Sequence, residues 1–204
     1  MLFNPAIWEW IKQSREKDML FGPNATQPFQ FFPGSITKIV DKPWWKALIG
    51  SEVKHGGSPI QGSTFDPQML GRGEPGNVRP LGNAFYTSNQ DTIANRYLKY
   101  APTKEKALNL FDIVEDAVVF PKGSLWHDMS TTEQEAYRKI SERATSVFKE
   151  KGLIKENQHW MDGIRKQGAR ELLKEVGVDA LAEKLPFPDT YEIGWYNPEA
   201  IIKK

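Results

Sequence analysis

A predicted strand, a turn and a helix follow one another between Gly82 and Tyr97, and each regular element carries one tyrosine. Tyr86 lies at the end of the strand expected at 83–87, and Tyr97 follows it by eleven residues. We expect Ser88 to cap the helix, and eleven residues make about three turns at roughly 3.6 residues per turn. Tyr97 is therefore predicted near the far end of that helix. Two rings placed in this way can bracket a flat heteroaromatic ring, although two ordinary half-buried tyrosines explain the segment equally well.

Length and composition are those of one soluble globular domain. The 204 residues suffice for a substantial core, and 39% hydrophobic with 26% charged residues is the usual balance. A formal net charge of +1 provides no field to gather polyanions, so strong non-specific binding to nucleic acid is not expected. The chain has no cysteine, which excludes disulfides, thiol nucleophiles and cysteine-ligated zinc.

No segment of the sequence has the length of a membrane span, and the first residues lack the basic and uninterrupted apolar regions of a secretory signal. We therefore expect a cytoplasmic protein without a membrane partner, and the lack of cysteine equally suits a protein delivered into another cell. His127 and His159 have no partners at metal-ligand spacing, so we predict no metal site.

Residues 1–50 are predicted to form a helical extension. They contain four of the seven tryptophans, and large aromatic side chains belong in cores and interfaces. We therefore expect the extension to pack on the core of the chain and not to form a separate domain. Its expected elements are a helix from Asn4 to Lys17, an irregular loop over 22–36, and a short helix from Pro43 to Ile49 that Asp41 caps.

Residues 51–204 combine strand and helix patterns and predict an α+β domain. A capping box at Ser130–Glu133, followed by apolar residues at helical spacing, is the clearest helix signal. Pro102 ends the helix that carries Tyr97, and Gly177 is a typical residue for the end of a later helix. The expected strands are one that ends at His55, 83–87, one or two within 107–120, 178–185 and 191–196, and the expected helices are 89–100, 130–151 and 157–176.

Three short blocks occur in the order that characterises a known enzyme superfamily. His55 precedes two glycines, Tyr86 and Tyr97 follow, and Glu192 opens a late predicted strand. In this order the blocks resemble the diphtheria-toxin-like ADP-ribosyltransferases, which are named for a His-Tyr-Glu triad. That superfamily includes the poly(ADP-ribose) polymerases and many bacterial and phage mono-ADP-ribosyltransferases. The resemblance covers about 52–202 and implies the ADP-ribosyltransferase fold, in which split, mostly antiparallel β-sheets are flanked by helices.

The resemblance assigns NAD+ binding to the turn that follows His55. It implies that His55 bonds the adenosine ribose, and that the N–H and C=O of Gly56 bond the carboxamide of nicotinamide. A residue without Cβ permits that close approach. The family follows His-Gly with Ser or Thr, whereas this chain has Gly57 before Ser58. Gly57 and Ser58 are therefore included in the predicted NAD+ site, with Ser58 as the candidate for the hydroxyl contact.

The resemblance also gives the tyrosine pair a role. Tyr86 and Tyr97 correspond to two tyrosines that stack on nicotinamide, and Ala94 corresponds to the small helix residue that packs beneath it. The sequence departs from the family at two neighbouring positions, because Ala84 replaces a glycine and Thr87 replaces a phenylalanine.

Glu192 is the catalytic residue that the resemblance implies, with His55 and Tyr86 completing the triad. Breaking the nicotinamide–ribose bond builds positive charge on the ribose, and a fixed carboxylate bonded to a ribose hydroxyl stabilises that charge where it develops. Arginine-modifying toxins carry Glu or Gln two residues before the catalytic Glu, and Thr190 stands at that position here. Arginine is therefore the less expected acceptor.

The sequence thus predicts an NAD-dependent mono-ADP-ribosyltransferase, with NAD+ as co-substrate and a protein or nucleic acid as the acceptor. The compact build is typical of bacterial or phage toxins and effectors, for which an antitoxin or immunity protein is a further expected partner. Two alternatives stay open: an NAD glycohydrolase on the same fold, and a catalytically silent binding module. The glycine-rich run at 71–76 is predicted to belong to a mobile lid over the NAD+ site and not to a phosphate loop.

Overall fold

The computed structural model describes residues 43–67, 80–101 and 103–204. Within these ranges the fold is α+β, as predicted, and contains a mixed sheet of seven strands in the order β4-β5-β6-β2-β1-β3-β7. Neighbouring strands are antiparallel except for β4 and β5, which are parallel. The strands are β1 (Glu52–Gly57), β2 (Phe85–Ser88), β3 (Ala107–Ile113), β4 (Val119–Lys122), β5 (Ala180–Lys184), β6 (Tyr191–Trp195) and β7 (Ile201–Lys203).

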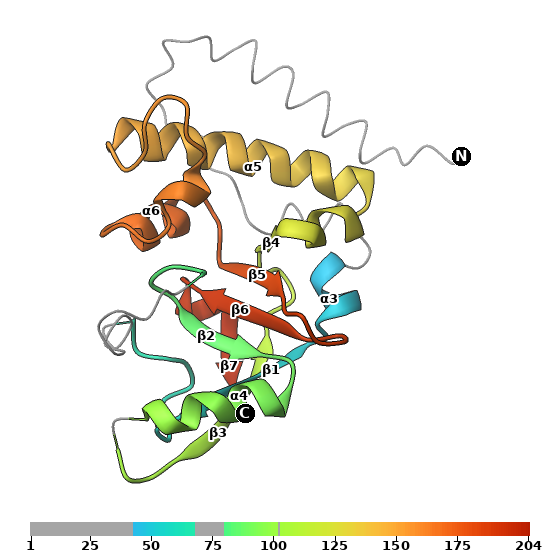
Figure 1. Cartoon of the computed structure of the whole chain (residues 1–204), viewed down its shortest axis with the longest axis vertical. Coiled ribbons are helices and arrows are strands. Elements are labelled where there is room, and N and C mark those ends of the chain that lie inside the picture. The colour runs from blue at the N-terminus through green and yellow to red at the C-terminus, as the bar shows by residue number, and fades with distance from the viewer. Residues whose placement is uncertain (1–42, 68–79, 102) are drawn as a thin grey trace.

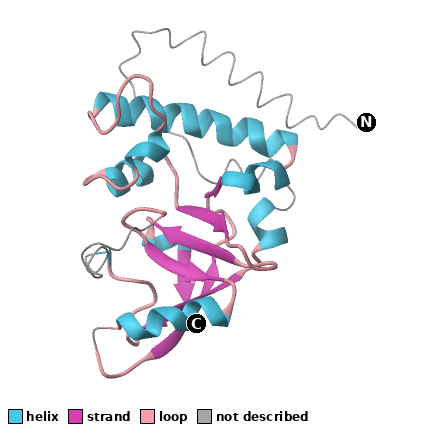
Figure 2. Cartoon of the chain, viewed as in Figure 1, coloured by secondary structure: helices cyan, strands magenta, loops and turns pink. Residues whose placement is uncertain are grey.

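The helices pack against this sheet in two separate groups. α4 (Asp91–Tyr97) packs on β1 and β2, whereas α5 (Thr131–Glu150) and α6 (Ala169–Glu175) contact each other near β4 and β5 (Figure 1). Figure 2 shows the strands between these two groups of helices. The remaining described helices are α3 (Trp44–Leu48) and the short 3₁₀ helices Leu98–Tyr100, Gly123–Asp128, Trp160–Gly163 and Pro198–Ala200.

The short helix α3 belongs to the hydrophobic core. Trp44 and Trp45 are almost fully buried, and their indole nitrogens donate to the carbonyl oxygens of Val119 and Ala117 at 3.0 and 3.1 Å. The first N–H of α3 donates to Glu133, whose carboxylate is 2.7 Å from Trp44 N. The helix start is therefore bonded by a residue of α5, and the predicted cap Asp41 lies outside the described residues.

Three further predictions fall outside the described residues: the helix from Asn4 to Lys17, the loop over 22–36, and the lid at 71–76. The capping box of α5 is confirmed, because Ser130 accepts from the Glu133 N–H and Glu133 accepts from the Ser130 N–H. One or two strands were predicted within 107–120, and the structure has two, β3 and β4, of which β4 continues past this range to Lys122.

Other predictions were wrong in detail. The strand predicted to end at His55 continues to Gly57, and β7 was not foreseen. Ser88 does not cap α4, which starts at Asp91 with Gln90 as its N-cap. Instead the Ser88 hydroxyl accepts from the Gln90 N–H at 3.1 Å and donates to the Tyr191 carbonyl at 2.8 Å, so it joins the start of α4 to β6.

The helix predicted over 157–176 is interrupted. A short 3₁₀ helix ends at Gly163, and α6 begins only at Ala169. Gly168 has a φ of 85°, a left-handed conformation that an α-helix interior does not use. The segment therefore turns between the two helices, although Gly177 does follow the end of α6 with φ 82°, as its C′ role predicts.

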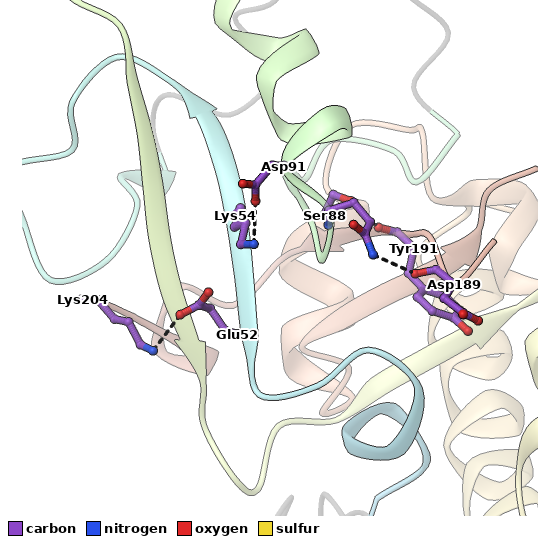
Figure 3. Close-up of polar contacts among 8 residues, drawn as sticks. Glu52, Lys54, Ser88, Asp91, Asp189, Tyr191 and Lys204 are labelled. Atoms are coloured by element: carbon purple, nitrogen blue, oxygen red, sulfur yellow. Dashed lines mark hydrogen bonds and ion pairs between the residues drawn. The ribbon is translucent and has the colours of Figure 1, made fainter. Parts of the chain in front are cut away.

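Gly56 determines how closely α4 approaches the sheet. A Cβ added at this residue would overlap the backbone carbonyl of Ala94, and Ala94 itself is fully buried. The helix therefore rests directly on the backbone of β1. Lys54, two residues earlier on the same face of the strand, pairs with Asp91 in the first turn of α4 at 2.6 Å (Figure 3).

We predict that Gly56→Ala destabilises the protein by roughly 1–3 kcal/mol, the usual cost of overpacking a tight core. The atom in the way belongs to the helix backbone and cannot rotate aside. Gly62→Ala is the matched control, because its Cβ would meet nothing closer than 3.6 Å. Denaturant unfolding of both variants measures the difference. Equal stability of the two would contradict this account of the α4–β1 contact.

Candidate active site

A hydrogen bond joins two predicted site residues that lie 95 positions apart in the chain. The hydroxyl of Tyr97, the last residue of α4, donates to the carboxylate of Glu192 in β6. The Tyr97 ring also lies against His55, with the ring centroids 6.2 Å apart and the planes 15° from parallel. Tyr97 therefore contacts one residue of β1 and one of β6, so that three predicted site residues, His55, Tyr97 and Glu192, form one cluster.

A row of polar residues crosses the sheet at Glu192. Strand register pairs Lys122 with Glu183, Glu183 with Glu192, Glu192 with Ser88, and Ser88 with Lys54. Directly paired residues project from the same face of a sheet, and this is the face on which α4 lies. The Lys122 ammonium is 3.2 and 3.3 Å from the two carboxylate oxygens of Glu183. Two carboxylates therefore stand side by side in the row, and each end of the row carries a lysine.

The His55 ring lies where β1 and β2 separate. Among the described residues, β1 pairs with β3 along its whole length but with β2 at Lys54 and Ser88 only. Past that pair, His55 Nδ1 donates to the carbonyl of Tyr86 at 2.7 Å. Because a carbonyl oxygen only accepts, Nδ1 carries the proton and the neutral ring presents Nε2 as an acceptor. Burial lowers the pKa of His55, against the opposing effect of the Tyr86 hydrogen bond, so burial favours that neutral form.

The two positions after His55 require glycine for different structural reasons. Gly56 accommodates α4, as described above. A Cβ on Gly57 would lie 2.6 Å from His55 Nε2, so the absence of a side chain leaves space beside the acceptor nitrogen. Gly56 is therefore packed against a helix and Gly57 lies next to the ring, and the approach of a ligand to the Gly56 backbone stays a prediction.

The hydroxyls of Ser58 and Tyr86 have hydrogen-bond partners within the chain. The Ser58 hydroxyl accepts from Thr103 at 2.8 Å. The Tyr86 hydroxyl accepts from the Leu81 N–H at 3.0 Å and donates to the Gly82 carbonyl at 3.1 Å. The Tyr86 hydroxyl therefore bonds the turn before β2, and the backbone carbonyl of the same residue contacts His55.

Asn109 is a site-supporting residue that the sequence analysis missed. It is buried in β3 opposite His55. Its amide donates to the carbonyls of Ser58 at 3.0 Å and of His55 at 3.4 Å, and its Oδ1 accepts from the Ile60 N–H at 3.0 Å. These bonds fix the chain as it leaves the His-Gly-Gly turn. The only sequence signal for this role is an asparagine between two leucines, Leu108 and Leu110.

Burial shapes the ionisation of the cluster. It is the main cause that raises the pKa of Glu192, and the neighbouring Glu183 adds to this, whereas the Tyr97 hydrogen bond and Lys122 act in the opposite direction. Burial also raises the pKa of Tyr97, reinforced by the negative charge of Glu192. The cluster thus combines the desolvated carboxyl group of Glu192 with the neutral phenol of Tyr97 and the neutral imidazole of His55. Ionisable groups with shifted pKa values of this kind are concentrated at functional sites.

The surface hollows lie elsewhere, along α5. One of about 750 Å³ includes Lys149 and Glu156 in its lining, and a second of about 380 Å³ is lined mainly by Phe120, Trp126 and Met161. We assign the site to the Tyr97 cluster and not to these hollows. The Tyr97 side chain itself occupies the space between His55 and Glu192, whereas the larger hollow is lined by a mixed set of partly paired surface charges and the smaller one is largely apolar.

Ser141 and His159, which both hollows share, do not form a catalytic dyad. His159 Nδ1 accepts from the Met161 N–H at 3.3 Å, so its Nε2 carries the proton and donates to Ser141 Oγ at 2.7 Å. A histidine in that tautomer cannot take the serine proton, which a nucleophilic serine requires.

The described residues contain no group of three or more His, Asp or Glu side chains arranged to hold a metal ion. None of the described helices combines the length and the apolar character needed to cross a membrane. Comparisons of the chain with protein-family models, curated proteins and solved structures find no match. The assignment of the site therefore rests on its geometry and on the sequence pattern.

We predict that Glu192→Gln stabilises the fold at neutral pH. A carboxyl whose folded-state pKa is raised contributes stability below its unfolded pKa and loses it as pH rises through the folded value. At pH 7 the wild type therefore carries a desolvation penalty that the neutral amide lacks, and a glutamine oxygen still accepts from Tyr97. The gain in melting temperature should vanish below about pH 4, near the ordinary pKa of Glu.

Glu52→Gln is the control, because Glu52 is a partly exposed sheet residue paired with Lys204 at 2.8 Å (Figure 3). Exposed pairs of this kind contribute about 0–1 kcal/mol, so this variant should not gain stability. A Glu192→Gln protein that melts below the wild type at pH 7 would show that its neighbours stabilise the carboxylate overall.

Proposed function

We propose that the chain is an NAD-dependent mono-ADP-ribosyltransferase with the ADP-ribosyltransferase fold, which cleaves the nicotinamide–ribose bond of NAD+ and transfers ADP-ribose to a macromolecular acceptor. The observation that carries the proposal is the contact of Tyr97 with both Glu192 and His55. These residues were singled out by their order in the chain alone, and no local feature of the sequence requires a helix end, a strand start and a glycine turn to meet.

Glu192 is the residue that stabilises the transition state in this proposal. Its carboxylate bonds a ribose hydroxyl and offsets the positive charge that develops as nicotinamide leaves. The partly desolvated environment strengthens this interaction, because charges attract more strongly where water is excluded. In the described structure the Tyr97 hydroxyl bonds the same carboxylate. Substrate binding therefore exchanges one hydroxyl donor for another and leaves no carboxylate oxygen newly unpaired.

His55 and the glycines bind the substrate at the other end of the cluster. Nε2 of the neutral ring accepts from a hydroxyl of the adenosine ribose, and the fixed Nδ1 bond to the Tyr86 carbonyl holds the ring in that orientation. The open space at Gly57 keeps the nitrogen accessible. Nicotinamide stacks with Tyr86 and Tyr97, and a ring contact of this kind contributes about 1 kcal/mol.

The test is the release of nicotinamide from NAD+ by the purified protein. We predict that Glu192→Gln lowers the rate by about 10²–10³, the usual effect of removing one preorganised electrostatic contact, without loss of the folded state. Glu171→Gln in α6, which removes an ion pair with Arg170, is the control and should keep the wild-type rate. Product analysis separates transfer to macromolecules in a cell extract from hydrolysis to free ADP-ribose.

Absence of nicotinamide release from the wild type, with and without the extract, would contradict the proposal and favour a binding module. Equal rates for the wild type and Glu192→Gln would mean that NAD+ is cleaved at another place. Release of free ADP-ribose alone, with no labelled macromolecule, would identify the enzyme as a glycohydrolase.

A further inference from the structure

Glu183 stands next to Glu192 and has no part in the activity described so far. The two residues are directly opposite in the antiparallel pair of β5 and β6, where Cβ atoms lie about 4.5–5.5 Å apart and side chains share one face. Glu183 is partly exposed, with 31% of its side-chain surface accessible. Water and a second substrate can therefore reach it.

The order of the strands places Glu183 on a definite side of Glu192. β6 lies between β5 and β2, so Glu192 separates Glu183 from Ser88, Tyr86 and the Tyr97 ring. The aromatic side chains that would stack on the leaving ring are on one side, and the second carboxylate is on the other. A displacement at a ribose carbon needs its nucleophile opposite the leaving group, which is the side of Glu183.

Lys122 orients the Glu183 carboxylate. Its ammonium contacts both oxygens of Glu183 and donates to the Pro80 carbonyl at 3.3 Å. A side chain fixed at both oxygens by a lysine from the neighbouring strand has few alternative rotamers. Orientation of this kind is what a proton-transfer group requires, because it must be within hydrogen-bond reach of the proton that it receives.

We propose that Glu183 is the general base that takes the proton from the nucleophile attacking the ribose. The inference rests on the proposed NAD+ activity and deepens it. The bond between ribose C1′ and the nicotinamide nitrogen breaks, and its electron pair leaves with neutral nicotinamide. A new bond forms between C1′ and an oxygen or nitrogen of the acceptor. The acceptor proton passes to the Glu183 carboxylate and then to solvent, so charge and atoms balance.

The proposal defines the chemical class of the acceptor. A carboxylate acceptor has no proton to lose and would be repelled by the paired carboxylates of Glu183 and Glu192. A neutral group that must lose a proton, such as a hydroxyl, an amide or a ring nitrogen, gains from a base at this position. Water belongs to the same class, so hydrolysis of NAD+ uses the same residue and serves as the assay.

The experiment measures nicotinamide release by Glu183→Ala in water and with increasing sodium azide. Loss of a general base typically costs about 10²–10⁴ in rate, and azide is a nucleophile that needs no deprotonation. We expect slow hydrolysis by Glu183→Ala, restoration of turnover by azide, and ADP-ribosyl azide as the product. Glu192→Ala should be slow as well and should not respond to azide, because it lacks the charge that stabilises the ribose.

Two further variants separate catalysis from structure. Lys122→Met breaks the same ion pair and keeps the carboxylate, so it should slow hydrolysis less than Glu183→Ala does, and azide should relieve this slowing as well. Glu52→Ala removes a comparable ion pair at the far end of β1 and should match the wild type. Wild-type hydrolysis by Glu183→Ala, or slowing that azide does not relieve, would overturn the role of Glu183. Failure of the wild type to release nicotinamide would overturn the proposed NAD+ activity instead.

Discussion

The direct contact of α4 with the backbone of β1 is the constraint on which the rest of the site depends. Gly56 has no side chain, and the Ala94 carbonyl lies in the space that a Cβ would fill. The helix is therefore close enough for Tyr97, at its last position, to reach both His55 and Glu192. The Lys54–Asp91 pair and the Ser88 hydroxyl fix the opposite end of the helix on the same strands. The absence of a Cβ at Gly56 thus determines the position of the Tyr97 ring, 41 residues later in the chain.

The site also illustrates how function and stability oppose each other. A cross-strand pair of carboxylates is unfavourable in a sheet, and Glu192 is in addition desolvated, which raises its pKa. Elsewhere the described part of the chain treats buried carboxylates differently. Glu133 accepts hydrogen bonds from the N–H groups of Trp44 and Ser130, and Asp179 accepts one from the Val118 N–H, although burial still raises the pKa of Asp179. Glu192 instead accepts from the Tyr97 hydroxyl, a side-chain donor that a substrate hydroxyl replaces in the proposed mechanism.

The sequence singled out residues that the fold brings close together, and their roles stay predictions. Tyr97 contacts both His55 and Glu192, and local sequence patterns do not report such contacts. The continuous helix predicted over 157–176 was wrong, since Gly168, with a φ of 85°, imposes a turn that apolar periodicity does not reveal. The sequence carries no signal for Glu183 and only a weak one for Asn109, an asparagine between two leucines. Their positions follow from strand register, which pairs Glu183 with Glu192, nine residues later, and Asn109 with His55, 54 residues earlier. Register is a property of the folded sheet.

Calorimetric titration with NAD+ and with ADP-ribose tests the central claim most directly, namely that the Tyr97 cluster binds the substrate through a stacked nicotinamide. Loss of about 1 kcal/mol of stacking should weaken NAD+ binding by Tyr97→Ala roughly fivefold. ADP-ribose lacks the nicotinamide ring, so its affinity should change little in the same variant, whereas His55→Ala should weaken both ligands. Equal weakening of NAD+ and ADP-ribose by Tyr97→Ala, or unchanged NAD+ affinity in both variants, would contradict the proposed site.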